Sequence, residues 1–127
     1  MTTEILRLLI VDDNFNVRTS LRIAFSIYDD LEVMGEARNG QEAVDWCAKF
    51  LPDIVLIDLL MPVMDGVTAT RIIRERFSSV KVVVLTSAPD ESLISAALEA
   101  GAASYLLKSV SVNDIVATLH NVARLIA

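Results

Sequence analysis

The sequence has one cysteine, and its basic residues are a minority. Cys47 alone excludes an internal disulfide and a cysteine-rich metal site, and we interpret it as a small apolar residue on a helix face. A lone cysteine also fits a reducing compartment, so we expect a cytoplasmic protein. The chain has 11 Lys and Arg against 17 Asp and Glu, a net charge of −6. This balance argues against direct binding to a nucleic-acid backbone.

No stretch has the features of a signal peptide or a membrane span. The apolar run at residues 5–11 is short, contains Arg7 and is followed by two aspartates. No run approaches the roughly 20 apolar residues that cross a bilayer. The 127 residues, 54% of them hydrophobic, fit one domain, and we see no linker or repeat. Because the helical pattern continues to Ala127, we expect this domain (1–127) to be the N-terminal part of a longer protein.

Five apolar runs alternate with segments of helical spacing. The first, third and fourth runs are nearly continuous in Val, Ile and Leu, which is typical of strands covered on both faces. The second run carries Glu32 and Glu36 and indicates a half-exposed edge strand. The five predicted strands are Ile5–Val11, Leu31–Ala37, Ile54–Ile57, Val80–Leu85 and Ala103–Leu107.

Helical patterns fill the gaps and follow the last strand. The fourth pattern, residues 90–100, ends at Gly101, and the last begins at Ser111 with Asp114 at capping-box spacing. His120 lies off the apolar stripe, so we expect an ordinary surface histidine. The predicted stripes comprise Val17, Leu21, Ala24 and Tyr28; Ala43, Trp46 and Phe50; the span 66–77; and Val112, Ile115, Val116, Leu119, Val122 and Ile126.

This strict alternation predicts an α/β fold with helices on both faces of a parallel sheet. We expect a flavodoxin-like, doubly wound, five-stranded sheet of order 2-1-3-4-5 with five helices. The carboxyl ends of its strands would then meet at one edge, where ligands bind in this class. The residues at those ends are Asp12 and Asp13, Asp58, Thr86 and Lys108.

Three carboxylates at one edge need charge compensation. Two like charges at about 4 Å repel by about 4 kcal/mol at an effective dielectric near 20. One ammonium, from Lys108, leaves two negative charges in excess, so either an acid is protonated or a cation binds. Oxygen ligands without histidine or thiolate favour a hard ion, Mg²⁺ first. Mg²⁺ commonly shares itself with a phosphate, and an aspartate can itself accept a phosphoryl group.

Together these residues resemble the receiver domain of two-component response regulators. The resemblance covers essentially the whole chain and implies the CheY-like form of the predicted fold. Within the family, three stretches resemble the NarL/LuxR-type subfamily, which usually carries a C-terminal helix-turn-helix domain that binds DNA. The matching residues are Asp12-Asp13, Asp58 with Met61-Pro62 and Gly66, Thr86 and Lys108, and the stretches are GEARNGQEAV (35–44), MDGVTAT (64–70) and EAGAASYLLK (99–108).

The resemblance also implies roles for the residues at the strand ends. Asp58 would accept a phosphoryl group from a phosphohistidine of a sensor histidine kinase, and Lys108 would pair with its oxygens. Mg²⁺ would be bound by Asp13 directly, by Asp12 directly or through water, by Asp58, and by the backbone carbonyl of Leu60. These residues would make the domain a phosphoacceptor and not a turnover enzyme.

A conformational change is implied as well. Thr86 would hydrogen-bond the phosphoryl group and Tyr105 would turn inward, which would change an output surface or a dimer contact. Family members often have Pro after the lysine with a cis bond, but Ser109 stands here, so we predict a trans bond. Leu60 and Ala88 flank the site, and neither side chain can orient a water molecule. We therefore expect slow self-dephosphorylation.

Other functions fit the sequence less well. A nucleotide or flavin module would need a phosphate-binding loop after the first strand, where this chain has the acidic DDNFNVR. A hydrolase with an aspartyl-phosphate intermediate would usually have a second acid where Leu60 stands. A degenerate receiver, which binds partners without being phosphorylated, remains the main alternative.

Overall fold

The computed structural model describes residues 4–87 and 89–124. Five parallel strands form one sheet in the order β2-β1-β3-β4-β5, as predicted. The predicted strands are confirmed to within one residue at either end. Their bounds are β1 Leu6–Val11, β2 Leu31–Ala37, β3 Ile54–Ile57, β4 Lys81–Thr86 and β5 Ser104–Leu107.

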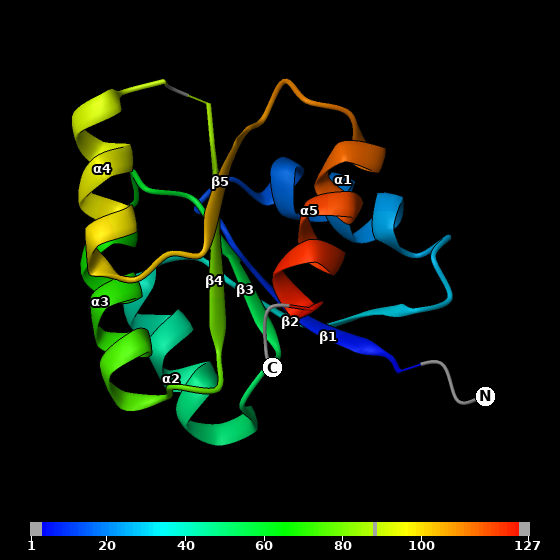
Figure 1. Cartoon of the computed structure of the whole chain (residues 1–127), viewed down its shortest axis with the longest axis horizontal. Coiled ribbons are helices and arrows are strands. Elements are labelled where there is room, and N and C mark those ends of the chain that lie inside the picture. Colours follow the sequence, from blue (N-terminus) through cyan, green and yellow to red (C-terminus); the bar gives the residue numbers. More distant parts are fainter. Residues whose placement is uncertain (1–3, 88, 125–127) are drawn as a thin grey trace.

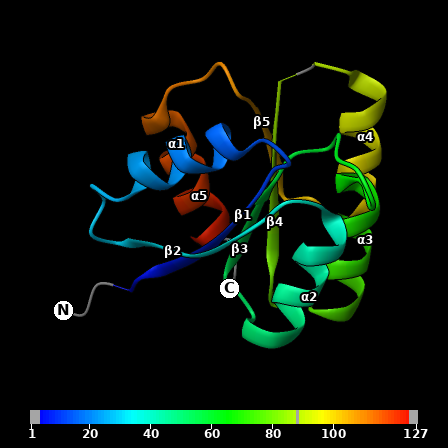
Figure 2. The same cartoon turned by 180° about the vertical axis from the view of Figure 1, so that it is seen from behind.

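Helices cover both faces of the sheet. Figure 1 shows α2, α3 and α4 on one side of the strands and α1 and α5 on the other, and the reverse view in Figure 2 agrees. None of the described helices combines the length and apolarity needed to span a bilayer. The helices are α1 Phe15–Phe25, α2 Gly40–Phe50, α3 Gly66–Arg76, α4 Glu91–Ala100 and α5 Val112–Arg124.

Two cores explain why the central strands are apolar without interruption. Successive side chains of a strand point to opposite faces, so Leu9 and Val11 pack toward α2, α3 and α4. Leu8 and Ile10 pack instead with residues of α1 and α5. Each position on β1 from Leu8 to Val11 is therefore buried, and β3 is buried at all four positions. Neither face of these strands is in contact with solvent, so successive positions are apolar, as the sequence pattern indicated.

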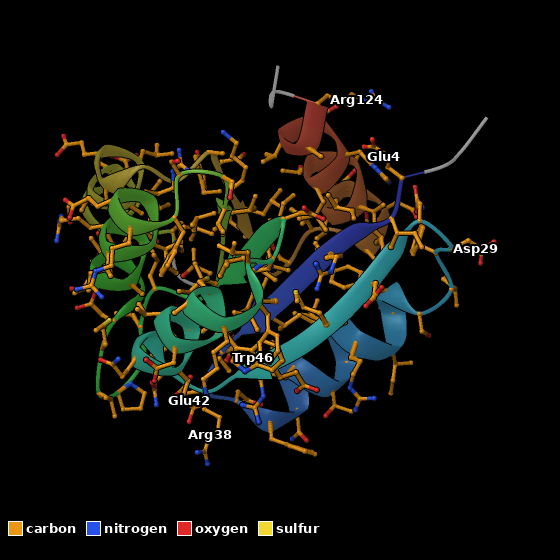
Figure 3. The ribbon with its side chains drawn as sticks, turned by 90° about the horizontal axis from the view of Figure 1, so that it is seen from below. Glu4, Asp29, Arg38, Glu42, Trp46 and Arg124 are labelled. Atoms are coloured by element: carbon orange, nitrogen blue, oxygen red, sulfur yellow. The ribbon has the colours of Figure 1, made fainter. Side chains whose placement is uncertain are left out.

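Strand β2 is the half-exposed edge strand that the sequence predicted. Its pairing with β1 skips Met34, because Leu8 pairs with Val33 and Leu9 with Gly35. Trp46 of α2 lies over this edge (Figure 3), and a Cβ built on Gly35 would lie 2.3 Å from the indole ring. The glycine thus leaves room for the tryptophan that covers the edge strand.

The helix ends agree with most of the predicted signals. Gly101 ends α4 with φ of 118°, and the Ser111 hydroxyl accepts the backbone N–H of Asp114. Helix α1 ends at Phe25, so the prediction that Tyr28 belongs to its apolar stripe is wrong. The Tyr28 hydroxyl instead donates to the side-chain oxygen of Asn113 at 2.6 Å. The last predicted stripe is buried at its central positions, and Ile126 lies outside the described residues.

Two side chains singled out by the sequence have different outcomes. Cys47 is buried on α2, as predicted, and burial raises the pKa of its thiol to about 12. His120 is not an ordinary surface residue. It is half-buried, and its Nε2 lies 3.0 Å from a carboxylate oxygen of Asp30 in the α1–β2 loop. The sequence could not show this pairing, because the two residues meet only after α5 packs beside that loop.

Candidate functional site

Backbone hydrogen bonds align the carboxyl ends of the central strands. The N–H of Asp12 donates to the carbonyl of Ala37 at 3.1 Å, and the N–H of Asp58 donates to Val11 at 3.0 Å. Between β4 and β5, the N–H of Lys108 donates to the carbonyl of Thr86 at 2.8 Å. The polar residues that follow the strands are therefore held by the sheet itself, which is more rigid than a free loop.

Three carboxylates converge at this edge. Asp12, Asp13 and Asp58 each contribute an oxygen, and these oxygens all lie within 4.8 Å of one another. Asp12 and Asp58 are buried, whereas Asp13 is exposed. The predicted meeting of residues 12, 13 and 58 is confirmed.

Lys108, which directly follows the carboxyl end of β5, also contacts this cluster. Its Nζ lies 2.6 Å from Oδ2 of Asp12 and 3.4 Å from Oδ2 of Asp58. The second oxygen of Asp58 accepts the backbone N–H of Leu59 at 2.8 Å. With one ammonium against three carboxylates, the site keeps an excess of negative charge.

Burial and charge shift the acidities in this site. Burial raises the pKa of Asp58; the charge of Lys108 opposes the rise, and the charge of Asp12 adds to it. Burial alone would lower the pKa of Lys108. The hydrogen bond to Asp12 and the charges of Asp58 and Asp12 outweigh it, so the pKa of Lys108 is raised. The lysine is therefore a permanent cation, while ionised Asp58 is held at a cost that an added cation would relieve.

Asp12 and Asp13 differ in how they are held. The carboxylate of Asp12 accepts the N–H of Asn14 at 2.9 Å as well as the ammonium of Lys108. The Asn14 side chain then caps α1 by accepting the N–H of Val17. Within the described part of the chain, the Asp13 carboxylate makes no hydrogen bond or ion pair. Asp13 is thus the carboxylate at this edge that is open to a ligand from solution.

The loop between β3 and α3 is closely packed against the end of β3. A Cβ on Gly66 would lie 2.2 Å from the carbonyl oxygen of Asp58, and the Gly66 N–H donates to the carbonyl of Leu59. The N–H of Gly40, at the start of α2, donates to the carbonyl of Met64 at 2.9 Å. Between these contacts Val63 has φ of 70°, a conformation that a β-branched residue rarely adopts. The loop is therefore held in a strained shape beside Asp58.

The other predicted site residues differ in how far they are exposed. Thr86 is buried at the end of β4, and 2% of its surface is exposed. Tyr105 on β5 and Leu60 after Asp58 are exposed at 46% and 57%. The peptide bond from Lys108 to Ser109 is trans, as predicted. Ala88, the second position named for water access, lies outside the described residues.

Sequence reasoning missed Arg18, which is buried beside the site. Its Nη1 donates to the backbone carbonyl of Asp12 at 2.8 Å, and its Nε donates to Glu36 of β2 at 3.1 Å. A signal was present, since Arg18 lies three residues before Leu21, near the predicted inner face of the first helix. Glu36, which marked β2 as an edge strand, is the charge that pairs with it.

The donor set fits a hard divalent cation. It consists of carboxylate oxygens, with no histidine or thiol among the described residues of the cluster, and it carries surplus negative charge. Asp13, Asp12 and Asp58 are the residues that could hold such an ion. The same edge offers Lys108 as a second positive group for an anionic ligand.

Comparison with known proteins identifies the family to which the chain is similar. The model of the response regulator receiver domain family matches residues 8–120. The transcriptional regulatory protein LnrK of Bacillus subtilis is 44% identical over 111 residues, which are 87% of this chain and 50% of LnrK. The response regulator protein VraR of Staphylococcus aureus is 39% identical over 119 residues, 94% of this chain and 57% of VraR. The chain thus spans about half the length of these relatives.

Solved structures agree with the family match. The receiver domain of the response regulator NarL from Mycobacterium tuberculosis gives a TM-score of 0.90 at 30% identity and covers 95% of this chain and 98% of its own. A LuxR-family two-component response regulator from Aurantimonas sp. SI85-9A1 gives 0.89 at 29% identity, with 95% and 86% covered. The chain therefore belongs to the response regulator receiver domain family and is of the NarL/LuxR type.

Proposed function

We propose that this domain is the phosphorylation-activated switch of a two-component system and that Asp58 accepts the phosphoryl group from a sensor histidine kinase. The observation that carries the proposal is the cluster of Asp12, Asp13 and Asp58 within 4.8 Å, with the Lys108 ammonium beside it. A nucleophile, an acidic cation site and a fixed positive charge are what phosphoryl transfer asks of a protein.

In the transfer step, a carboxylate oxygen of Asp58 bonds to phosphorus while the bond from phosphorus to the donor's imidazole nitrogen breaks. The leaving imidazole keeps the bonding electrons and takes up a proton from water. Lys108 lies 3.4 Å from Asp58, close enough to pair with an oxygen of the incoming group. The backbone N–H of Leu59 binds one Asp58 oxygen, which leaves the other to react.

Mg²⁺ is the proposed cofactor. Asp13 would bind it directly, Asp12 directly or through water, and Asp58 and the backbone carbonyl of Leu60 would complete the protein's ligands. When bound, the ion neutralises charge on the cluster and on the phosphoryl oxygens. The raised pKa of Asp58 supports this assignment, since an added cation would favour the ionised carboxylate.

The proposed readout is a two-state change at Thr86 and Tyr105. Thr86 is buried at the carboxyl end of β4, and its hydroxyl would hydrogen-bond a phosphoryl oxygen. Tyr105 is exposed two strand positions before Leu107, the partner of Thr86. Phosphorylation shifts the equilibrium because the phosphoryl group interacts differently with the two states. The affected surface would be that of α4, β5 and α5, or a homodimer contact.

In the longer protein we propose a C-terminal helix-turn-helix output domain, so that DNA is bound only through that domain. Two observations support this. The chain spans about half of its relatives, and LnrK is named a transcriptional regulatory protein. The receiver itself carries net charge −6, which disfavours DNA binding by this part.

Intact-mass measurement tests the proposal. We expect one added phosphoryl group after incubation with acetyl phosphate or phosphoramidate and Mg²⁺. The adduct should be lost in Asp58→Asn and on chelation. Asp53→Asn is the matched control, because Asp53 precedes the same strand at its opposite end. If the wild-type protein gains no phosphoryl group from several donors, the domain acts as a degenerate receiver that binds partners without phosphorylation.

A further inference from the structure

A buried arginine links the edge strand to the acidic site. Arg18 lies on the first turns of α1, and only 9% of its surface is exposed. Its Nη1 donates to the carbonyl oxygen of Asp12 at 2.8 Å, while its Nε donates to Oε1 of Glu36 at 3.1 Å. The ring of Phe15 lies 5.8 Å from the guanidinium carbon. A rigid, planar group thus bridges β2 and the end of β1.

The contacted carbonyl belongs to the peptide that joins Asp12 to Asp13. The orientation of that peptide plane sets the direction in which Asp13 leaves the strand, because the peptide unit is planar. Asp12 is held by other contacts too, through Asn14 and Lys108. Asp13 has no side-chain partner in the described structure, so the peptide before it is what directs its carboxylate toward the cluster.

We propose that Arg18 is a positioning residue for the cation site and that it acts by fixing the Asp12–Asp13 peptide. The inference rests on one part of the proposed function, the assignment of Asp13 as a direct ligand of Mg²⁺. Glu36 of β2 fixes the orientation of the guanidinium by accepting a hydrogen bond from its Nε. Hydrogen-bonded partners of metal ligands commonly set affinity by 10- to 100-fold, and Arg18 serves that purpose through the backbone.

The charge of Arg18 predicts the opposite effect from its hydrogen bond. If the arginine acted only as a nearby cation, its removal would tighten Mg²⁺ binding, because like charges repel. If it positions Asp13, its removal weakens binding. Arg18→Lys separates the two, since lysine keeps the charge but its single ammonium cannot reproduce the planar bridge.

The chain offers a matched control in Arg22. Arg22 lies one turn further along α1 and donates to the other oxygen of the same Glu36 at 3.0 Å. It makes no contact with Asp12 among those the structure describes, and its side chain is half exposed. Arg22→Lys therefore alters a contact of the same acidic partner, Glu36, and leaves the hydrogen bond to the Asp12–Asp13 peptide in place.

The experiment measures the Mg²⁺ dissociation constant of the folded domain by calorimetry, with no phosphodonor present. We expect it to rise by about tenfold in Arg18→Lys and in Arg18→Met, and to stay within about twofold of wild type in Arg22→Lys. Thermal unfolding in EDTA reports the structural cost separately. A purely structural role for Arg18 would lower the unfolding midpoint in EDTA and leave the Mg²⁺ dissociation constant unchanged.

An unchanged constant in Arg18→Lys overturns the inference while leaving the proposed function intact. Tighter binding in Arg18→Met together with an unchanged Arg18→Lys would assign Arg18 a role of charge alone and also overturn it. A wild-type domain that binds no Mg²⁺ overturns both. A wild-type domain that binds Mg²⁺ but gains no phosphoryl group overturns only the proposed function.

Discussion

The ammonium of Lys108 lies 2.6 Å from a carboxylate oxygen of Asp12, although 96 positions separate the two residues in the chain. The same ammonium is farther from Asp58, at 3.4 Å. Asp12 therefore takes the closer contact with the lysine, and Asp58 is left with less compensation for its burial. This asymmetry agrees with the upward shift in the pKa of Asp58 and leads to a prediction about stability.

Asp58→Asn should stabilise the Mg²⁺-free domain at pH 7. The folded pKa of Asp58 is above its ordinary value of 3.8, so the folded state binds more protons than the unfolded state between these two pKa values. Stability is therefore lost as pH rises through this window, and the penalty is complete above the folded pKa. The neutral amide avoids it, so we expect the unfolding midpoint of Asp58→Asn to lie above that of the wild-type protein at pH 7.

Thermal unfolding of both proteins across pH checks this prediction. The difference in midpoint should shrink as pH falls toward 3.8, because protonated Asp58 carries no charge. A constant difference at all pH values would assign the effect to packing and contradict the electrostatic explanation.

Mg²⁺ should stabilise the folded wild-type domain, and this stabilisation should be lost when a proposed Mg²⁺ ligand is replaced. Binding to the folded state adds about 2.7 kcal/mol when the ion is at 100 times its dissociation constant. We expect Asp13→Asn to lose most of the Mg²⁺-dependent rise in the unfolding midpoint. Asp29→Asn is the control, because Asp29 is an exposed acid in the α1–β2 loop (labelled in Figure 3). A full Mg²⁺ response in Asp13→Asn would remove Asp13 from the site.

Gly66→Ala should disrupt the site, whereas Gly35→Ala should be tolerated better. Both added methyl groups would approach an atom closely, at 2.2 Å for Gly66 and 2.3 Å for Gly35. At Gly66 that atom is the backbone oxygen of Asp58, but at Gly35 it belongs to the Trp46 side chain, which can turn. We expect Gly66→Ala to cost about 3 kcal/mol or more and Gly35→Ala about 1–2 kcal/mol.

Denaturant unfolding measures both costs, and intact mass measures phosphorylation of what remains folded. Gly66→Ala should also reduce phosphoryl acceptance, because Asp58 must shift to admit the methyl group. The double change Gly35→Ala with Trp46→Leu should regain part of the loss, since it removes the ring that the new methyl group meets. Equal costs for the two single alanines would contradict the difference between backbone and side-chain neighbours.

The fold and the acidic cluster could be predicted because they depend on pattern and topology. Alternation of apolar runs and helical spacing fixes a parallel sheet, and a parallel sheet brings Asp12, Asp58 and Lys108 to one edge whatever their side-chain conformers. The hydrogen bond from Arg18 to the Asp12 carbonyl depends on one rotamer of a long side chain. No periodicity encodes that choice, so the structure was needed to find it.

The same reason explains the other differences. His120 meets Asp30 because α5 packs beside the α1–β2 loop, which is a tertiary contact without a local signal. The positive φ of Val63 runs against the preference of a β-branched residue, so local propensity alone would not have placed it there. Two clamps impose it instead, the hydrogen bonds from Gly40 to Met64 and from Gly66 to Leu59. Both clamps hold the loop beside the proposed phosphoacceptor.

Leu60 should set how long the phosphoryl group remains on Asp58. Leu60 is 57% exposed, two residues after Asp58, and its side chain offers no group that could orient an attacking water. A positioned polar side chain can accelerate such a step by 10²- to 10⁴-fold when its geometry is optimal. An asparagine placed without further adjustment should achieve only part of this, so we expect Leu60→Asn to shorten the half-life by about threefold to tenfold. Adding Ala88→Glu should shorten it further.

Loss of the phosphoryl group is followed by intact mass after the donor is removed. The control is Leu98→Asn, which replaces an exposed leucine on α4. If the half-life is unchanged in Leu60→Asn and in the double variant, water access at these two positions does not limit hydrolysis, and slow self-dephosphorylation must have another cause.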